Sequence, residues 1–251
     1  MDVPEVPVKE LHARLGFPEP IDYPESSLSK PLTQWKMEID DSPILRYVYR
    51  NFRPRRHLEF GTWEGAGVVY CLGECDASVW TINLLEGEQQ SHGRWAYGRL
   101  FSALERLPPW SKKRKVAAEG LEYQTDSLGF IGRHYLEKGL GNRVCQIYCE
   151  SRDWDISNYP DGFFDTVLVD GGHSEEVVTS DTRKALQLVR PGGLVMWHDF
   201  CPRRETYRKC ASTRGVLKAV HANWDWISGQ MKDIFWVNPS FLLIGVKAEE
   251  T

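Results

Sequence analysis

Two apolar segments, each followed at once by an acidic side chain, constrain the fold of this chain more than any other feature. Val167–Val169 runs into Asp170, and Leu194–Trp197 runs into His198 and Asp199. Fully apolar strands separated by a helix are typical of a parallel sheet that is covered on both faces. We therefore expect an α/β fold: a doubly wound, Rossmann-like sheet, mostly parallel with a C-terminal antiparallel strand, and helices on both faces.

The segment between these two strands has the pattern of a single helix with clear ends. Ser174 is a candidate N-cap, and Glu175 and Glu176 place negative charge in the first turn, where the helix dipole favours it. Pro191–Gly193 predicts the end of the helix and a sharp return into the next strand. A right-handed crossover then makes the two strands parallel, so that their carboxyl ends meet at one edge of the sheet.

The rest of the chain extends this pattern on both sides. Hydrophobic periodicity and turn residues predict strands at 57–60, 78–84 and 144–148, a C-terminal antiparallel hairpin of 235–237 with 241–246, and helices at 8–15, 42–51, 68–72, 126–138 and 213–227. Residues 1–55 are expected to form an N-terminal arm with helices, irregular in its proline-rich part. Residues 56–251 are expected to form the core, with an insertion at about 86–124.

Composition limits the classes of partner. The formal net charge of −4 gives no reason to expect nucleic acid. No apolar stretch approaches the ~20 residues that span a bilayer, and the acidic, proline-broken start does not resemble a signal peptide. The six cysteines include no CxxC pair, which favours free thiols in a reducing compartment over a structural zinc site. We expect a cytoplasmic protein that binds neither nucleic acid nor membrane.

Four polar side chains are expected at the carboxyl edge of the sheet, where open α/β sheets bind their ligands. His173 and His198 are candidate general bases, and Asp170 is a third candidate catalytic residue. Asp170 and Asp199 follow neighbouring strands, about 4.8 Å apart. Two carboxylates at that separation suit a hard cation such as Mg²⁺, so the pair is a candidate metal site.

A glycine-rich turn follows the first core strand, between Glu59 and Gly67, with the pattern E-x-G-x-x-x-G-x-G. Such a turn lets the backbone approach a ligand closely. A dinucleotide loop, G-x-G-x-x-G, would place a third glycine at Tyr70 and an acid at the end of the second strand, where Asn83 stands. A nicotinamide-dependent oxidoreductase is therefore the alternative interpretation of this loop.

In this order and spacing, the motifs of residues 57–200 resemble class I S-adenosylmethionine-dependent methyltransferases, in the branch of small-molecule, antibiotic-type O-methyltransferases. The resemblance rests on the glycine loop, the strand end Glu150–Ser151, the segment F-D-T-V-L-V-D-G-G-H, the R-P-G-G turn and the strand end W-H-D-F. It implies methyl transfer from S-adenosylmethionine to a small-molecule acceptor, most simply at oxygen. A non-catalytic, cofactor-binding subunit with the same fold is a further alternative.

The resemblance also implies which residues bind the cofactor. They follow the carboxyl ends of the core strands: Glu59, Gly61, Thr62, Trp63 and Gly65 at the methionine part, Asn83 or Glu86 at the ribose, Glu150 and Ser151 at the adenine, and Asp170 near the sulfonium. Related O-methyltransferases place a metal beside Asp170, although His198 stands where some have a further acidic ligand.

Tryptophan is abundant for a chain of this length, with ten residues. Four of them are candidates for an aromatic acceptor pocket: Trp63, Trp95, Trp110 and Trp197. The N-terminal arm and the insertion are expected to cover the acceptor site and are candidates for a homodimer contact.

Overall fold

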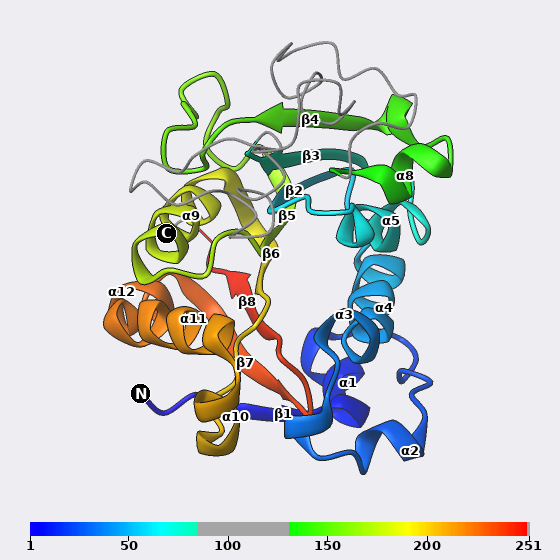
Figure 1. Ribbon diagram of the computed structural model, residues 1–251, viewed down its shortest axis with the longest axis vertical. Helices are drawn as coiled ribbons and strands as arrows, with labels where there is room; N and C mark the ends of the chain where they lie inside the picture. Colours follow the sequence, from blue (N-terminus) through cyan, green and yellow to red (C-terminus); the bar gives the residue numbers. More distant parts are fainter. Residues whose placement is uncertain (85–130, 250–251) are drawn as a thin grey trace, which may run out of the picture.

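The computed structural model describes residues 1–84 and 131–249 (Figure 1). The predicted insertion at 86–124, and with it Glu86, lies outside these residues. Within them, no helix has the length and apolar character that crossing a membrane requires.

One eight-stranded sheet organises the described part of the chain, with the strand order β1-β7-β8-β6-β5-β2-β3-β4. The five strands from β6 to β4 pair in parallel, and β8 pairs antiparallel with both β6 and β7. This confirms the predicted fold class. The strands are β1 Glu5–Pro7, β2 Arg56–Phe60, β3 Ser78–Asn83, β4 Val144–Tyr148, β5 Phe164–Val169, β6 Val189–Trp197, β7 Met231–Asn238 and β8 Leu243–Lys247.

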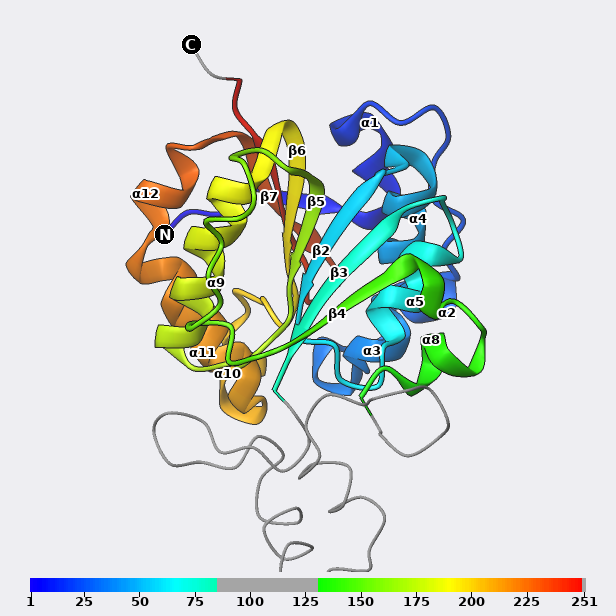
Figure 2. The same cartoon turned by 90° about the horizontal axis from the view of Figure 1, so that it is seen from above.

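Helices cover both faces of the sheet, as Figure 2 shows with the sheet seen nearly edge-on. One face carries α9, α11 and α12, and the other carries α4, α5 and α8. The α-helices are α1 Leu11–Leu15, α2 Glu25–Leu28, α3 Met37–Asp40, α4 Ser42–Phe52, α5 Ala66–Leu72, α8 Arg133–Glu137, α9 Glu175–Leu188, α10 Arg204–Lys209, α11 Ala211–Ala222 and α12 Trp224–Ser228. Short 3₁₀ turns are η1 Val8–Glu10, η2 Leu32–Gln34 and η3 Gly141–Arg143.

The β5–α9–β6 unit follows the sequence pattern except at the end of its helix. Ser174 is the N-cap, and its side chain accepts a hydrogen bond from the backbone N–H of Val177. The helix ends at Leu188, and Pro191–Gly193 lies inside β6 instead of in the predicted turn before it. The β5–β6 register shifts at Phe164/Thr166, so the Pro-Gly-Gly segment belongs to an irregular strand start.

The N-terminal arm contributes a strand that the sequence did not predict. β1 pairs in parallel with β7, with Val6 opposite Val237. Val6, Val8 and Leu11 are buried, so this part of the arm packs into the same core as the sheet. The predicted helix at 213–227 is in fact two helices, α11 and α12. The proposed division at residue 55 stays a prediction.

Candidate active site

The site lies at the carboxyl ends of β2, β5 and β6, where the chain leaves the sheet. The backbone N–H of Asp170 donates to Phe60 O at 2.9 Å, and that of His198 donates to Val169 O at 3.1 Å. The first bond continues β5 beside β2 for one residue past the end of β5, and the second continues β6 beside β5 for one residue past the end of β6. The expectation that Asp170, His198 and Asp199 follow adjacent strands is confirmed.

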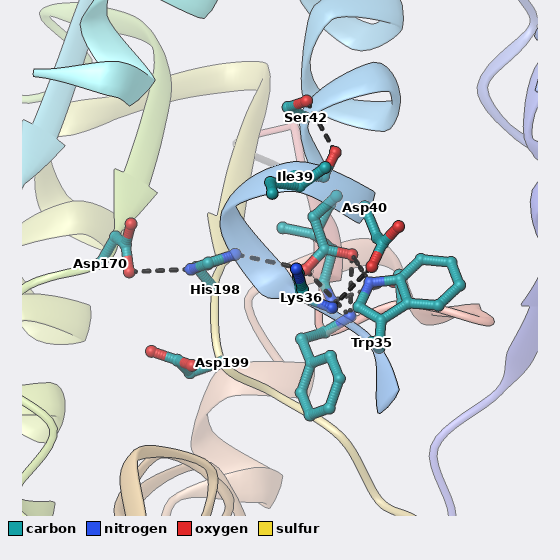
Figure 3. Close-up of polar contacts among 12 residues, drawn as sticks. Trp35, Lys36, Ile39, Asp40, Ser42, Asp170, His198 and Asp199 are labelled. Atoms are coloured by element: carbon teal, nitrogen blue, oxygen red, sulfur yellow. Dashed lines mark hydrogen bonds and ion pairs between the residues drawn. The ribbon is translucent and has the colours of Figure 1, made fainter. Parts of the chain in front are cut away.

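His198 lies between two carboxylates. Its Nδ1 is 3.0 Å from Oδ1 of Asp170, and its Nε2 is 3.3 Å from Oδ2 of Asp41. Figure 3 shows the ring spanning the space between Asp170 and the N-terminal segment that carries Trp35 and Asp40. Both ring nitrogens therefore face acceptors, an arrangement that the doubly protonated imidazolium satisfies.

Asp41 is a site residue that the sequence reasoning missed. It is completely buried, where α3 meets α4. Its Oδ1 accepts a hydrogen bond from the indole Nε1 of Trp35 at 2.9 Å, and its carboxylate also accepts from the backbone N–H of Phe241. Burial raises the pKa of Asp41, whereas the hydrogen bond and charge of His198 lower it. The N-terminal segment thus places a buried carboxyl group beside His198.

The charges around His198 decide its protonation. Burial by itself would lower the pKa of His198, but the charge of Asp170 and the hydrogen bonds to Asp170 and Asp41 raise it well above its ordinary value. The raised pKa favours the protonated, cationic form of His198, and both of its nitrogens face carboxyl groups. In this arrangement it is a poor candidate for the general base and a good electrostatic partner for Asp170.

His173 forms a second histidine–carboxylate pair. Its Nε2 is 2.5 Å from Oδ2 of Asp199, whose Oδ1 accepts a hydrogen bond from Oγ of Ser212 at 3.0 Å. The His173 side chain is 40 % exposed, whereas that of Asp199 is 6 % exposed. Burial would lower the pKa of His173, but its hydrogen bond to Asp199 raises it overall. Asp199 thus holds Nε2 of an imidazole whose side chain stays partly exposed.

Three side chains of the site meet the geometric requirement for holding one cation. Ligand atoms of Asp170, His173 and Asp199 all lie within 4.8 Å of one another. The predicted pair of carboxylates is therefore close together, and His173 adds a nitrogen donor. Two carboxylates suit Mg²⁺, whereas an imidazole in the set also suits transition metals.

The glycine loop packs directly on the end of β5. Gly61 has a φ of +96°, and a Cβ at that position would lie 2.1 Å from the carbonyl oxygen of Asp170. Glu59 is buried, and its Oε2 has no hydrogen-bond partner among the described residues. A Cβ at Gly67 would meet that oxygen at 2.6 Å, so glycine leaves room for it at the start of α5. Burial raises the pKa of Glu59 well above its ordinary value.

The other predicted residues of the loop point in different directions. The hydroxyl of Thr62 is buried and bonds with Thr81 and Gln146, so it faces the sheet. Trp63 is 55 % exposed, and its backbone N–H donates to Oδ1 of Asn83 at 3.2 Å. Asn83 therefore braces the loop from the end of β3.

The remaining predicted residues lie after β4 or inside the core. Glu150 pairs with Arg152 in the loop that begins after β4, and Ser151 lies between them. Trp197 is completely buried and donates its indole N–H to Thr182 at 2.9 Å. The expectation that Trp197 lines an acceptor pocket is therefore wrong, and Trp95 and Trp110 lie outside the described residues.

Comparison with known proteins adds a family to this geometry. Residues 58–200, more than half of the chain, match the family model described as a methyltransferase domain. A candidate caffeoyl-CoA O-methyltransferase from Staphylococcus aureus is 14 % identical, with 96 % of this chain and 90 % of that chain covered and a TM-score of 0.51. An O-methyltransferase from Bacillus cereus in complex with SAH is 14 % identical, with 96 % and 97 % covered and a TM-score of 0.50. No curated protein matches the chain.

Proposed function

Because the chain belongs to the family of methyltransferase domains, we propose that it transfers the methyl group of S-adenosylmethionine to an oxygen atom of a small-molecule acceptor. The observation that carries this proposal is the shared edge of the sheet. There the glycine loop packs against the strand end of Asp170, and the pair of His173 and Asp199 stands beside it. A ligand-binding loop and a proton acceptor thus lie in one site.

Glu59 supports the fit of the cofactor. A buried carboxylate oxygen without a partner is costly, and ligand binding can remove that cost. Oε2 of Glu59 has no hydrogen-bond partner among the described residues and lies beside the glycine loop. The ammonium group of an amino acid moiety would give this oxygen its donor. We assign the methionine end of the cofactor to Glu59, Gly61 and Gly65.

The other contacts follow from the same placement. The backbone of Thr62 and Trp63, rather than the buried Thr62 hydroxyl, would complete the methionine end. Asn83 would contact the ribose, and Glu86 stays a prediction because it lies outside the described residues. Glu150 and Ser151 would hold the adenine. When bound, S-adenosylmethionine supplies a methyl group on a sulfonium, which Asp170 would face.

The general base that accepts the proton of the acceptor hydroxyl is His173. His173 directs Nε2 toward Asp199, so Nδ1 is the nitrogen that accepts the proton. The bound cofactor would supply the methyl group to the acceptor oxygen, and its sulfur would keep the electron pair of the broken sulfur–carbon bond. Asp199 holds the ring and stabilises the imidazolium that forms. His198 keeps Asp170 in place and does not take the proton.

A divalent cation is a second way to activate the hydroxyl. Asp170 and Asp199 would hold Mg²⁺, with His173 as a third donor, since their ligand atoms lie within 4.8 Å of one another. A cation there would bind the acceptor oxygen and lower the pKa of its hydroxyl. Activity after treatment with EDTA, and after Mg²⁺ or Mn²⁺ is returned, distinguishes the two: loss and recovery support the cation, and unchanged activity supports His173 as base.

The remaining expectations have unequal support. The six cysteines, all within the described residues, form no disulfide, which supports the proposed cytoplasmic location. The homodimer stays a prediction.

Against the nicotinamide alternative, the second core strand ends in Asn83, where a dinucleotide loop would have an acid. Against a non-catalytic subunit, the His173 side chain stays 40 % exposed while Asp199 holds one of its nitrogens.

The experiment is methyl transfer from S-adenosyl-[methyl-¹⁴C]methionine to a panel of catechols, phenolic acids and hydroxylated antibiotics, with products identified by mass spectrometry. We expect an O-methylated product that D170A abolishes. Cofactor turnover with methylation only at nitrogen or carbon would contradict the proposed acceptor atom, and D170A with the wild-type rate would remove Asp170 from the mechanism.

A further inference from the structure

Lys184 of α9 binds the loop after β4 in an uncommon way for a lysine. Its ammonium group donates to the carbonyl oxygens of Ser151, Arg152 and Trp154, the last two at 2.9 and 2.8 Å. An ammonium group has three donor hydrogens, so three carbonyls match its capacity. Most lysines keep this group in water, whereas Lys184 is partly buried, and burial lowers its pKa.

The three carbonyls fix the backbone of one short turn. Carbonyl groups that converge on a single cation set the orientation of the peptide planes on both sides of Arg152. The turn is held from a second direction too, because Trp154 packs edge-on against Phe60, with ring centroids 6.0 Å apart. Phe60 directly precedes Gly61 of the glycine loop. The 151–154 turn is thus fixed to α9 and to the end of β2.

The same face of α9 also reaches the turn after β5. A Cβ on Gly171 would lie 3.2 Å from Oδ2 of Asp181, one helical turn before Lys184. Asp181 is completely buried. Burial raises the pKa of its carboxyl group, whereas the side chain of Ser151 and the charge of Lys184 lower it. Two polar side chains of α9 therefore contact both turns between which the nucleoside would bind.

We propose that Lys184 is a positioning residue for the adenosyl end of the cofactor: its ammonium group fixes the 151–154 backbone and so holds Glu150 and Ser151 in the orientation that binds adenine. This inference rests on the proposed function, since it takes S-adenosylmethionine as the ligand. Lys184 itself does not touch the cofactor. Its effect is therefore on affinity for any ligand that carries the adenosine group.

The test is isothermal titration calorimetry of K184M with two ligands, S-adenosylhomocysteine and 5′-methylthioadenosine, which lacks the amino acid part. We expect both dissociation constants to rise by the same factor, about tenfold, which corresponds to the loss of one or two net hydrogen bonds. K218M is the matched control, because Lys218 is exposed on α11. It should leave both constants within about twofold of wild type.

The outcomes separate the inference from its premise. Wild-type affinity in K184M would overturn the role of Lys184 alone, and so would a loss for S-adenosylhomocysteine without a loss for 5′-methylthioadenosine. A wild-type protein that binds neither ligand would contradict the proposed function and the inference with it. If K184M does not fold, K184R replaces it in the same comparison, since its planar guanidinium cannot reproduce the three-carbonyl geometry.

Discussion

Asp41 and His198 are in contact at 3.3 Å, although one belongs to the N-terminal arm and the other follows β6 in the core. Asp41 lies outside residues 58–200, the region that matches the family model, whereas His198 lies inside it. The contact therefore links the N-terminal arm to the end of β6. His198 in turn positions Asp170, because its other nitrogen lies 3.0 Å from Oδ1 of Asp170. The arm is thereby part of the active site as well as of the core.

We predict that D41N lowers kcat and leaves cofactor binding intact. Asparagine keeps an oxygen for the Trp35 and Phe241 hydrogen bonds but removes the charge that holds His198. Misplacement of Asp170 by a fraction of an ångström should lower kcat about 10- to 100-fold. The dissociation constant for S-adenosylhomocysteine, measured by calorimetry, should stay within about twofold of wild type, because Asp41 does not reach the glycine loop.

A double mutant shows whether Asp41 acts through His198. If it does, D41N has little further effect on kcat in an H198N background, because the partner it restrains is gone. Full additivity of the two losses of kcat would mean that Asp41 does not act through His198. Thermal unfolding of each variant, measured alongside, separates loss of folded protein from loss of rate.

We predict that His173, not His198, is the base. H173N should reduce kcat at least about 100-fold, the usual contribution of general base catalysis, while the affinity for S-adenosylhomocysteine is unchanged. D199N should give a smaller loss of kcat, because the imidazole remains but its orientation is no longer fixed. H173N with wild-type kcat would contradict this assignment and direct attention to the cation.

Gly61 should be intolerant of any side chain. At φ +96° a Cβ is strained, and it would also meet the carbonyl of Asp170 at 2.1 Å. We expect G61A to destabilise the protein by about 1–3 kcal/mol or more and to abolish S-adenosylhomocysteine binding. G139A is the comparison, because Gly139 has a similar φ of +68° but nothing within 4 Å of its Cβ. Equal losses in the two variants would show that the close packing of the loop is unimportant.

Asp181 should make stability depend on pH. Burial raises the pKa of Asp181 to about 7, above the ordinary value of 3.8. The folded state therefore binds the proton more tightly than the unfolded state, so this contribution to stability is complete below pH 4 and is lost as pH rises through 7. D181N lacks this loss. The melting temperature of D181N relative to wild type should rise between pH 4 and pH 8, and a constant difference would contradict the assignment.

The core of the fold could be predicted because its signals are local. Val167–Val169 and Leu194–Trp197 are apolar on both faces, and Ser174 caps the helix between them, so pattern alone determined the β5–α9–β6 unit. Val6 in β1 was missed because a three-residue strand that follows one proline and ends in another carries no periodicity. The helix end was placed too late because Pro191–Gly193, usually a stop signal, serves here as an irregular strand start.

The site could be predicted only as far as strand ends determine it. Asp170, His198 and Asp199 follow adjacent strands, so topology brings them together. Asp41 could not be found this way. It directly precedes Ser42 and Pro43, and an acidic residue at that place is typical of an ordinary helix start. Whether a histidine is free or engaged also depends on residues distant in sequence, and for that reason His173 and His198 were equivalent candidates before the structure was known.

The central claim is tested most directly by isothermal titration calorimetry of the wild-type protein with S-adenosylmethionine and, separately, NADH, each with and without EDTA and Mg²⁺. We predict binding of S-adenosylmethionine with a dissociation constant in the range of about 1 μM to 1 mM that is typical of enzyme substrates, and no heat with NADH. Binding of NADH, with none of S-adenosylmethionine under either condition, would contradict the account.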